Sequence, residues 1–477
     1  MRVDRFDANQ SVLKDPYVLY DFYTAGDLMQ NGRKIQMDDQ SWAEVPDNIG
    51  NDYVVYVNKL TEKTSIVGYR NGNTWYNGDG VEVNDPTVIG MGAGSAPWLK
   101  DAKQQNVDIN SFKDYDPAWS VMPRISFSFP ISDEALFFAH YDVLTQRPSS
   151  DFYCSPLYYY RFNENNDDIA NPNLKPAQTI EYELGFTQKV TNTSSLTISA
   201  YYHELRNMIQ MYRFNGAYPK SYNSFSNLDF GTVKGLTASY DMRRTKNARI
   251  RASYTLQYAD MTGSSTSTAS ALIAAGVPNL RSTFPSSSDR RHGFNLSLDY
   301  RFADGKDYDG PVIHRKDGKD IQILSNTGLN LSVNGGSGTP YTASRTVTSP
   351  ISGGNKLLQG TYNGSRIPAS FRFDLRVDKD FTFKIGASKD GEKKGRDAFL
   401  NVYVQVLNLL NSKNIVGVYN ATGNADDDGY LSAPAWQREI NEQIDPQAFI
   451  QMYQLIVNSG YNYSMPRHIR VGLSFNF

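Results

Sequence analysis

The chain has one cysteine, almost no net charge and no long hydrophobic run. Because Cys154 is the only cysteine in 477 residues, no intrachain disulfide framework can form. It lies among aromatic residues, a setting typical of a packed thiol rather than a nucleophile. Lysine and arginine number 48 against 50 aspartate and glutamate residues, a net charge of −2. A nucleic-acid binder is expected to carry an excess of basic residues, so this balance argues against nucleic acid as a partner.

The chain also lacks helical segments that would enter a membrane. Its mean hydropathy is −0.52, and no run approaches the roughly 20 apolar residues that a spanning helix needs. The first residues, MRVDRFDANQ, contain no apolar segment of the kind found in a secretory signal peptide. Taken alone, this start indicates the cytoplasm, which conflicts with the rest of the chain.

Signatures of catalysis and of metal binding are scarce. The five histidines form no HExxH motif, and no GxSxG motif occurs, so we expect no enzyme activity and no cofactor. One weak metal candidate is NADDDGY, where Asn424, Asp426 and Asp428 precede Gly429 as in the first half of a calcium loop. Ala435 occupies the position that needs a bidentate glutamate, which favours an ordinary polar turn.

Alternation of apolar and polar residues is abundant. In FNLSLDYRF, residues 294–302, each odd position is polar and each even position is apolar or aromatic, and the same pattern closes the chain at 469–477. A period of two predicts strands with one apolar and one polar face. We therefore expect an all-β fold of about twelve strands. They are expected at about 1–8, 121–130, 135–145, 178–189, 194–212, 229–243, 248–261, 291–303, 326–341, 369–382, 397–411 and 467–477.

The segments between the strands divide into short and long. Short turns alternate with long polar loops at about 9–119, 261–289 and 412–465, which predicts an antiparallel meander with one plain rim and one elaborated rim. Two of the turns on the plain rim are enlarged. A hairpin is expected at 52–77, and the one convincing helical stretch is 436–459, with a proline near its middle.

Alternation alone does not prove a membrane protein, because the solvated face of a soluble sheet is polar too. Three further features favour a transmembrane barrel. Tyrosine and phenylalanine, 32 and 24 residues, gather near strand ends. The apolar spans match the roughly 9–11 residues of a tilted spanning strand, and loop lengths differ between the two rims as in outer-membrane barrels. In lipid only a closed barrel pairs every backbone group, so these strands must close a ring, alone or with others.

Several segments resemble one receptor family. NPNLKPAQTIEYELGF (171–186) resembles the segment that leads into a barrel strand of TonB-dependent outer-membrane receptors. NGGSGTPYT (334–342), FRFDLRVDKDF (371–381) and LNVYVQVLNLLNSKNIVGVY (400–419) look like the last hairpins of that family, and PRHIRVGLSFNF (466–477) like its end. The similarity covers nearly the whole chain and is closest to the SusC/Oar-like type.

The resemblance implies a fold and a set of partners. Family barrels have about 22 strands and a plugged lumen, so the chain is expected to be the C-terminal half of the barrel, spanning residues 1–477. The signal peptide, plug and TonB box would then lie upstream of Met1, and the chain would be a fragment or a split or truncated reading frame. Implied partners are outer-membrane lipid, the barrel-assembly machinery, the TonB complex through the plug, and a surface lipoprotein.

The resemblance also assigns roles to residues. The polar strand face is expected to line the lumen, where most of its charges contact the plug. The terminal aromatics are expected to form the signal that the assembly machinery reads. The expected lumen residues are Glu181, Glu183, Arg251, Asp299, Arg301, Arg372, Asp374 and Arg376, and the assembly residues are Phe475 and Phe477.

The favoured function is TonB-dependent uptake of an unidentified substrate across the outer membrane. One alternative is a self-contained barrel of about twelve strands that acts as a passive pore or a surface enzyme. Another is a soluble carbohydrate-binding β-domain. Aromatic loop residues could stack on a sugar or peptide, although ordinary packing is favoured for each of them. These residues are Trp42, Trp75, Tyr76, Trp98, Tyr218 and Tyr222.

Closure of a twelve-stranded ring would need residues 1–8 to pair with residues 467–477. The first segment is short, and Val3 and Phe6 fall on opposite faces, so its apolar face is too short to cross a bilayer. We therefore predict an open, incomplete wall.

Overall fold

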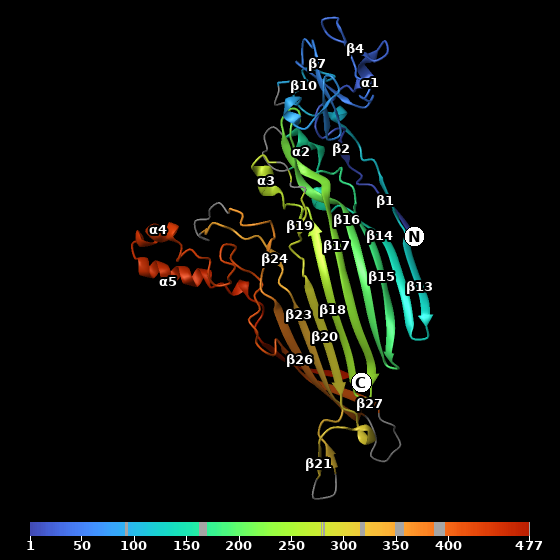
Figure 1. Ribbon diagram of the computed structural model, residues 1–477, viewed down its shortest axis with the longest axis vertical. Helices are drawn as coiled ribbons and strands as arrows, with labels where there is room; N and C mark the ends of the chain where they lie inside the picture. The colour runs from blue at the N-terminus through green and yellow to red at the C-terminus, as the bar shows by residue number, and fades with distance from the viewer. Residues whose placement is uncertain are drawn as a thin grey trace.

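One long antiparallel sheet dominates the computed structural model (Figure 1). The structure describes residues 1–90, 94–161, 169–277, 279, 282–314, 320–348, 357–385 and 396–476. Eleven strands pair in the order in which they follow one another along the chain. They are β13 (Arg124–Ser132), β14 (Ala135–Gln146), β15 (Ala177–Thr191), β16 (Ser194–Phe214), β17 (Tyr222–Thr245), β18 (Ala248–Met261), β20 (His292–Arg301), β23 (Thr327–Gly336), β26 (Ser370–Ile385), β27 (Arg396–Leu407) and β28 (His468–Asn476).

The all-β meander predicted from the alternation is confirmed, with one correction to the strand count. The eleven strands match the expected segments from 121–130 to 467–477. The twelfth member of the sheet is the short β19 (Phe284–Pro285), which pairs with β18. Residues 1–8, expected as the first strand, form β1 (Arg2–Phe6), which pairs instead with β12 (Ala118–Met122) in a separate two-stranded sheet.

The sheet is open, as predicted. Its pairing order begins at β13 and ends at β28. β12 runs into β13 through Pro123, so β1 reaches only the upper end of this edge. All nine residues of β13 are exposed, as are eight of the nine in β28. Two strands at opposite ends of the sheet therefore offer backbone groups that a further strand could pair with.

The two rims of the sheet differ as the loop lengths predicted. At the short-turn rim, two-residue turns join β14 to its neighbour β13, β15 to β16, and β17 to β18. The enlarged connector between β20 and β23 carries β21 (Val312–His314) and β22 (Asp320–Gln322), which pair below the sheet (Figure 1). The other enlarged turn falls on residues 386–395, outside the described residues.

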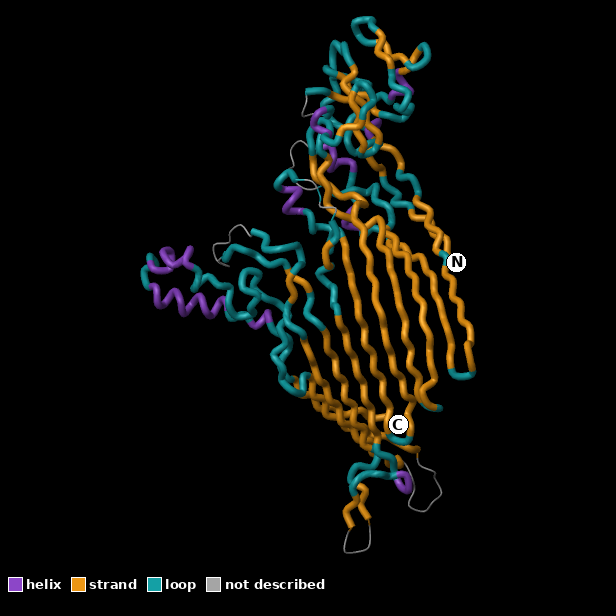
Figure 2. The backbone as a smooth tube through the Cα atoms, viewed as in Figure 1, coloured by secondary structure: helices purple, strands orange, loops and turns teal. Residues whose placement is uncertain are grey.

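At the long-loop rim, residues 14–111 fold into a unit that we call the apical unit. The predicted hairpin is part of a five-stranded sheet ordered β10-β6-β7-β8-β9, so this segment is much more than a polar loop. Figure 2 shows the apical unit standing above β16 and β17. Its helix is α1 (Ala25–Leu28), and its strands are β3 (Met29–Gln30), β4 (Lys34–Gln36), β5 (Trp42–Glu44), β6 (Val54–Val57), β7 (Ile66–Asn71), β8 (Thr74–Asn77), β9 (Glu82–Val83) and β10 (Ala96–Pro97).

Smaller elements complete this rim. β2 (Ser11–Leu13) pairs with β11 (Phe112–Asp114) below the apical unit. The remaining elements are α2 (Pro156–Tyr160), α3 (Ser270–Ala274), β24 (Pro340–Tyr341) and β25 (Ser365–Arg366). No helix in the described part of the chain is long and apolar enough to cross a membrane.

The expected helix at 436–459 is two helices, α4 (Gln437–Asn441) and α5 (Pro446–Val457). Proline cannot continue a helix but fits its first position. Pro446 begins α5, and the carboxylate of Asp445 accepts a hydrogen bond from the Ala448 amide at 3.0 Å. We call residues 424–462 the helical arm, which projects sideways from the sheet in Figure 1.

Candidate functional site

The register of the long sheet determines which side chains share a face. Directly paired residues of neighbouring antiparallel strands lie on the same face. Glu183 pairs with His140 and with Tyr201, and this row continues through Gly235 to Gln257. Rows of this kind place all eight expected lumen residues on one face of the sheet. We call this the polar face, and it carries Glu181, Glu183, Arg251, Asp299, Arg301, Arg372, Asp374 and Arg376.

Charges of opposite sign are paired on the polar face. Arg251 Nε lies 2.8 Å from Asp241 on the neighbouring strand. Near the short-turn rim, Arg301 contacts both Asp378, at 2.7 Å, and Asp380. Asn401 donates to the same two carboxylates at 3.1 and 2.6 Å. These contacts satisfy the charges within the wall, so the face is polar without a large excess of one sign.

Aromatic rings cover glycines on the same face. The Tyr403 ring lies against Gly472 of β28, so closely that a Cβ there would collide with it. The Arg376 guanidinium stacks over the Tyr403 ring at 4.0 Å from its centroid. An aromatic side chain that fills the space of a glycine on the next strand holds the register of the pair. Tyr201 and Gly235 repeat this arrangement.

The opposite face of the sheet is apolar and exposed. Leu184 is 57% exposed and Leu473 is 71% exposed. Phe475 pairs with Leu400, which pairs with Phe381, so the expected assembly residue belongs to this apolar face. Phe477 lies outside the described residues. Wide exposure of large apolar side chains marks a surface that is covered by something other than water.

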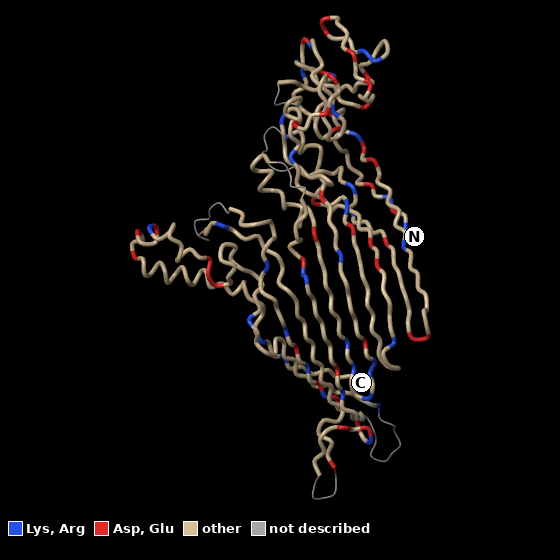
Figure 3. Tube along the Cα trace, viewed as in Figure 1, with Lys and Arg blue, Asp and Glu red and all other residues tan. Residues whose placement is uncertain are grey.

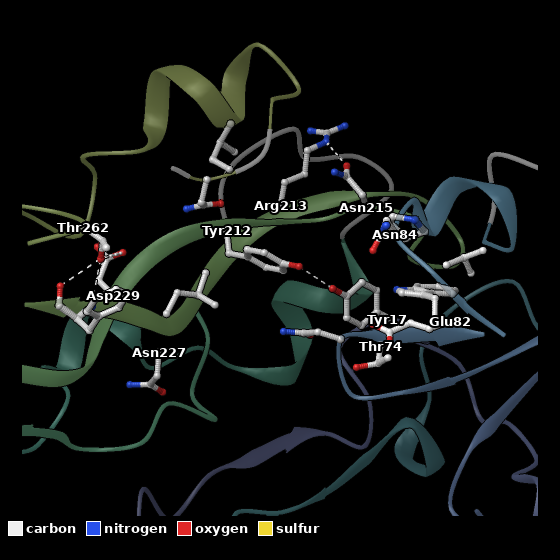
Figure 4. Close-up of a pocket in the computed structure, with 18 residues that line it drawn as sticks. Tyr17, Thr74, Glu82, Asn84, Tyr212, Arg213, Asn215, Asn227, Asp229 and Thr262 are labelled. Atoms are coloured by element: carbon white, nitrogen blue, oxygen red, sulfur yellow. Dashed lines mark hydrogen bonds between the residues drawn. The ribbon is translucent and has the colours of Figure 1, made fainter. Parts of the chain in front are cut away.

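A polar pocket of about 400 Å³ lies where the apical unit meets β16, β17 and α3. In Figure 4 the rings of Tyr17 and Tyr212 point toward each other, and their hydroxyl groups are 2.8 Å apart. Asn84 and Glu82 come from the apical unit and line the same pocket on the side of Tyr17. The walls therefore come from chain segments about 200 residues apart.

Some polar groups of this pocket are already used by the fold. The Asp229 carboxylate accepts hydrogen bonds from Gln210 at 2.7 Å and from Thr262 at 3.0 Å. The Asn227 amide donates to the carbonyl groups of Lys175 and Asn207. Amides and tyrosine hydroxyl groups with little net charge suit an uncharged polar ligand. Nothing local in the sequence marked this pocket.

A buried arginine lies behind the pocket. Arg70 is 1% exposed and its guanidinium is 2.6 Å from the Asp15 carboxylate. The guanidinium also stacks over Tyr17, with its carbon 4.8 Å from the ring centroid, and it donates a hydrogen bond to the Gly72 carbonyl at 2.8 Å. Burial lowers the pKa of Arg70, but Asp15 and Tyr56 together raise it more, so the pKa ends above its ordinary value. The pair fixes the position of one pocket wall.

The loop aromatics have structural surroundings in most cases. Trp75, Trp98 and Tyr222 are buried, so the packing role favoured for them fits their position. Trp42 is exposed and stays available for contact with a ligand. Cys154 is half-buried, its thiol donates to the Ala170 carbonyl at 3.2 Å, and burial raises its pKa.

The calcium-loop candidate makes contacts within the helical arm. Asp428 accepts a hydrogen bond from the Tyr453 hydroxyl at 2.5 Å, and Asp426 accepts one from Tyr463 at 2.5 Å. The bond to Asp426 raises the pKa of the Tyr463 phenol. The backbone carbonyl of Asn424 accepts a hydrogen bond from the Tyr419 amide at 2.8 Å. Within the described ranges, no three His, Cys, Asp or Glu side chains are grouped to hold a metal ion.

Solved structures with a similar chain path come from outer-membrane receptors. The ferripyoverdine receptor of Pseudomonas aeruginosa is 11% identical, with 76% of this chain and 33% of that chain covered and a TM-score of 0.41. The outer membrane transporter YddB from Escherichia coli is 13% identical, with 64% and 39% covered and a TM-score of 0.41. The ferric-catecholate import receptor Fiu from Escherichia coli is 11% identical, with 78% and 38% covered and a TM-score of 0.38. The chain spans about a third of the length of these structures.

A search of curated proteins found no match. The model of the outer membrane protein beta-barrel family matches residues 29–313, which include most of the apical unit and the sheet from β13 to β20. The strands β23 to β28 continue the same sheet beyond this match. Because the match covers more than half of the chain, the protein belongs to the outer membrane protein beta-barrel family and resides in the outer membrane.

Proposed function

We propose that the chain forms the C-terminal part of the barrel of a TonB-dependent transporter of the SusC/Oar-like type. The polar face lines the lumen, the apolar face contacts lipid, and the long-loop rim lies outside the cell. The observation that supports this proposal most is the open, two-faced sheet, with β13 and β28 both exposed at its ends. Eleven long strands are half of the roughly 22 that the resemblance implies. The remaining strands would join at these two edges.

In this function the chain supplies a wall and binding loops rather than chemistry. A substrate would enter from the long-loop rim, and the pocket beside Tyr17 and Tyr212 lies at that entrance. TonB would act through a plug domain inside the completed barrel. The substrate would be too large or too scarce for porins, and a surface lipoprotein would assist at the long-loop rim.

Growth experiments test the transport proposal. A strain without the protein should lose growth on at least one member of a panel of iron chelates, peptides and glycans, and loss of TonB should cause the same defect. The purified chain alone should give no steady, uniform conductance in planar bilayers. A growth defect that does not depend on TonB, together with steady single-channel currents, would favour a passive pore.

Labelling tests the two faces. In a background where Cys154 is replaced by alanine, Leu184→Cys should react with a lipid-soluble maleimide and Arg251→Cys with a water-soluble one. The remaining lipid-facing positions to compare are Tyr182, Phe186, Phe294, Leu296, Leu298, Phe373, Leu375 and Leu473, and the remaining lumen positions are Asp299, Asp374 and Arg376. Equal labelling of both sets by the water-soluble reagent would contradict the assignment.

The end of the chain is proposed to act in assembly. Phe475 and Phe477 would be read by the barrel-assembly machinery, with little direct role in transport. Deletion of Phe477 from a complete receptor should lower the amount of heat-modifiable barrel in the membrane. An unchanged amount of barrel with reduced uptake would show that this role is wrong.

A further inference from the structure

The helical arm has its own compact core. The Tyr430 and Tyr453 rings stack at 4.7 Å, and both side chains are buried. The Tyr419 hydroxyl donates to the Val457 carbonyl at 2.7 Å, and the Trp436 indole donates to the Val347 carbonyl at 3.0 Å. The first bond holds the C-terminal end of α5, and the second ties the start of α4 to the loop that contains Val347. The arm is therefore a defined surface and not a loose loop.

Helix α5 presents three stripes around its circumference. One stripe, with Tyr453 and Val457, packs into the core of the arm. A second stripe consists of glutamines, among them Gln447. The third stripe is apolar and exposed: Met452, Leu455 and Ile456 are spaced by three and four residues, so they lie on one side of the helix. A helix that is apolar on two sides is normally buried between two layers.

The exposure of this third stripe is large. Leu455 is 79% exposed and Met452 is 63% exposed. Ile444, in the turn before α5, is also fully exposed. Methionine and apolar side chains without charged neighbours on the same stripe are typical of the centre of a protein interface. Figure 1 shows the arm projecting away from the sheet, so the sheet does not cover this stripe.

The helical arm that carries this stripe is strongly negative. Residues 424–462 contain six carboxylates and a single basic residue, Arg438, which is already paired with Glu442 at 2.7 Å. Figure 3 shows the acidic positions along the arm. Helices that lie on lipid surfaces carry lysine and arginine on their polar side, and α5 has no charged residue at all. The surface therefore disfavours an anionic lipid layer and suits a basic protein surface.

We propose that the apolar stripe of α5 docks a separate protein whose contact surface is apolar at its centre and carries lysine or arginine at its rim. Glu442 and Asp445 lie in the segment that leads into α5, and their carboxylates set the charge expected of the partner. The contact anchors this partner beside the long-loop rim. It rests on the proposed placement of that rim outside the cell, but it does not require that the barrel transports a substrate.

Photo-crosslinking in intact cells tests this contact. p-Benzoylphenylalanine at position 455 of the complete protein should give one crosslinked species with a separate protein, whereas the same probe at position 447, on the glutamine stripe, should not. Mass spectrometry should place the crosslink beside apolar and basic residues of that partner. The triple variant Met452→Gln, Leu455→Gln, Ile456→Gln should weaken binding of the identified partner at least tenfold.

Charge variants provide the second readout. Glu442→Gln with Asp445→Asn keeps the size of both side chains, and asparagine still caps α5. This pair should weaken partner binding by roughly two- to five-fold, as expected for exposed ion pairs, and added salt should reduce the difference. Growth of these variants on the transported nutrient separates this proposal from the transport proposal, because loss of the contact and loss of uptake are measured independently.

Several outcomes would overturn the proposal. In the crosslinking experiment they are the absence of any crosslink from position 455, or a crosslink to lipid, to another part of the same polypeptide or to an acidic surface. In the binding experiment it is partner binding by the charge variants that equals binding by the unaltered protein. Circular dichroism of the purified variants controls for loss of the helix.

Discussion

The long sheet and the apical unit use the same strand pattern in opposite ways. In the apical unit the large apolar side chains of β6 are buried on both sides, with Val54, Val55, Tyr56 and Val57 at most 3% exposed. In the long sheet the apolar side chains are exposed on one face, and the polar side chains lie side by side in rows on the other face. The difference fits the proposed placement, in which water surrounds the apical unit and lipid contacts the apolar face of the sheet.

The largest expected effect is a loss of stability in the apical unit alone. Arg70→Met leaves the mostly buried Asp15 carboxylate without its ion-pair partner, which typically costs about 3–5 kcal/mol. Hydrogen exchange at the β6 amides should speed up accordingly, while amides of β15 keep their protection. Arg5→Met, at an exposed ion pair with Asp7, is the control and should change stability by less than about 1 kcal/mol. Loss of protection in both regions would mean that they unfold as one.

The next largest effect is a loss of stability in the long sheet alone. Leu184→Lys places a charge on the apolar face, which costs about 2–4 kcal/mol near the bilayer centre. Glu183→Lys is the matched control, because it changes the adjacent residue on the polar face. Urea unfolding of the barrel in lipid vesicles should separate the two variants. Similar losses for both would show that the sheet does not have one lipid face.

A smaller effect is expected where the two regions meet. A Cβ at Gly263 would collide with the Asp229 carboxylate and crowd Gln210. Overpacking of this kind costs about 1–3 kcal/mol, so Gly263→Ala should lower the thermal stability of this junction. Gly293→Ala has open space around its Cβ and should be tolerated. If both variants behave alike, the junction is looser than its hydrogen bonds indicate.

The smallest effect distinguishes two buried tyrosines of the apical unit. The Tyr56 hydroxyl accepts a hydrogen bond from Arg70 at 3.3 Å, whereas the Tyr69 hydroxyl has no hydrogen-bond partner among the described residues. Tyr56→Phe should therefore cost about 1 kcal/mol, and Tyr69→Phe should be neutral or stabilising. Thermal unfolding followed by tyrosine fluorescence gives the comparison.

The same tyrosines predict a response to alkaline pH. Burial raises the pKa of both Tyr56 and Tyr69 to about 12, while an unfolded tyrosine ionises near pH 10. The folded state keeps protons that the unfolded state loses, so stability is constant below about pH 10 and falls as the pH rises toward 12. Absorbance at 295 nm should show these two phenols ionising together with unfolding of the apical unit. Each Phe variant should reduce the loss.

The sequence predicted the long sheet well because alternation is a local property. Period-two runs located eleven strands, and one register then placed eight polar side chains on one face. The first strand was misplaced because Arg2–Phe6 pairs with β12, over 100 residues away, and no local pattern reports a partner. Pro446 was visible in the sequence as an interruption of the expected helix. In the structure Asp445 caps a new helix that starts at Pro446, so the segment forms two helices and not one kinked helix.

The pocket and the apical core could not be predicted in this way. Tyr17 and Tyr212 meet across 195 positions, and Arg70 reaches Asp15 only after β7 is in its sheet. Their residue types are ordinary for loops. What makes them a site is the contact between two separate parts of the chain, which depends on packing and not on spacing.

The pairing of β2 with β11 has a consequence for how such a protein can change. Leu13 lies directly opposite Phe112, and the Lys14 amide donates to the Ser111 carbonyl at 3.0 Å. The chain therefore leaves the apical unit at the point where it entered, as in a cassette inserted into a hairpin. Residues 14–111 could be exchanged for a tight turn that keeps β2 paired with β11, since closing a shorter loop costs little entropy. A single recombination event could supply or remove the whole module, which would let one barrel acquire a different surface for a different environment.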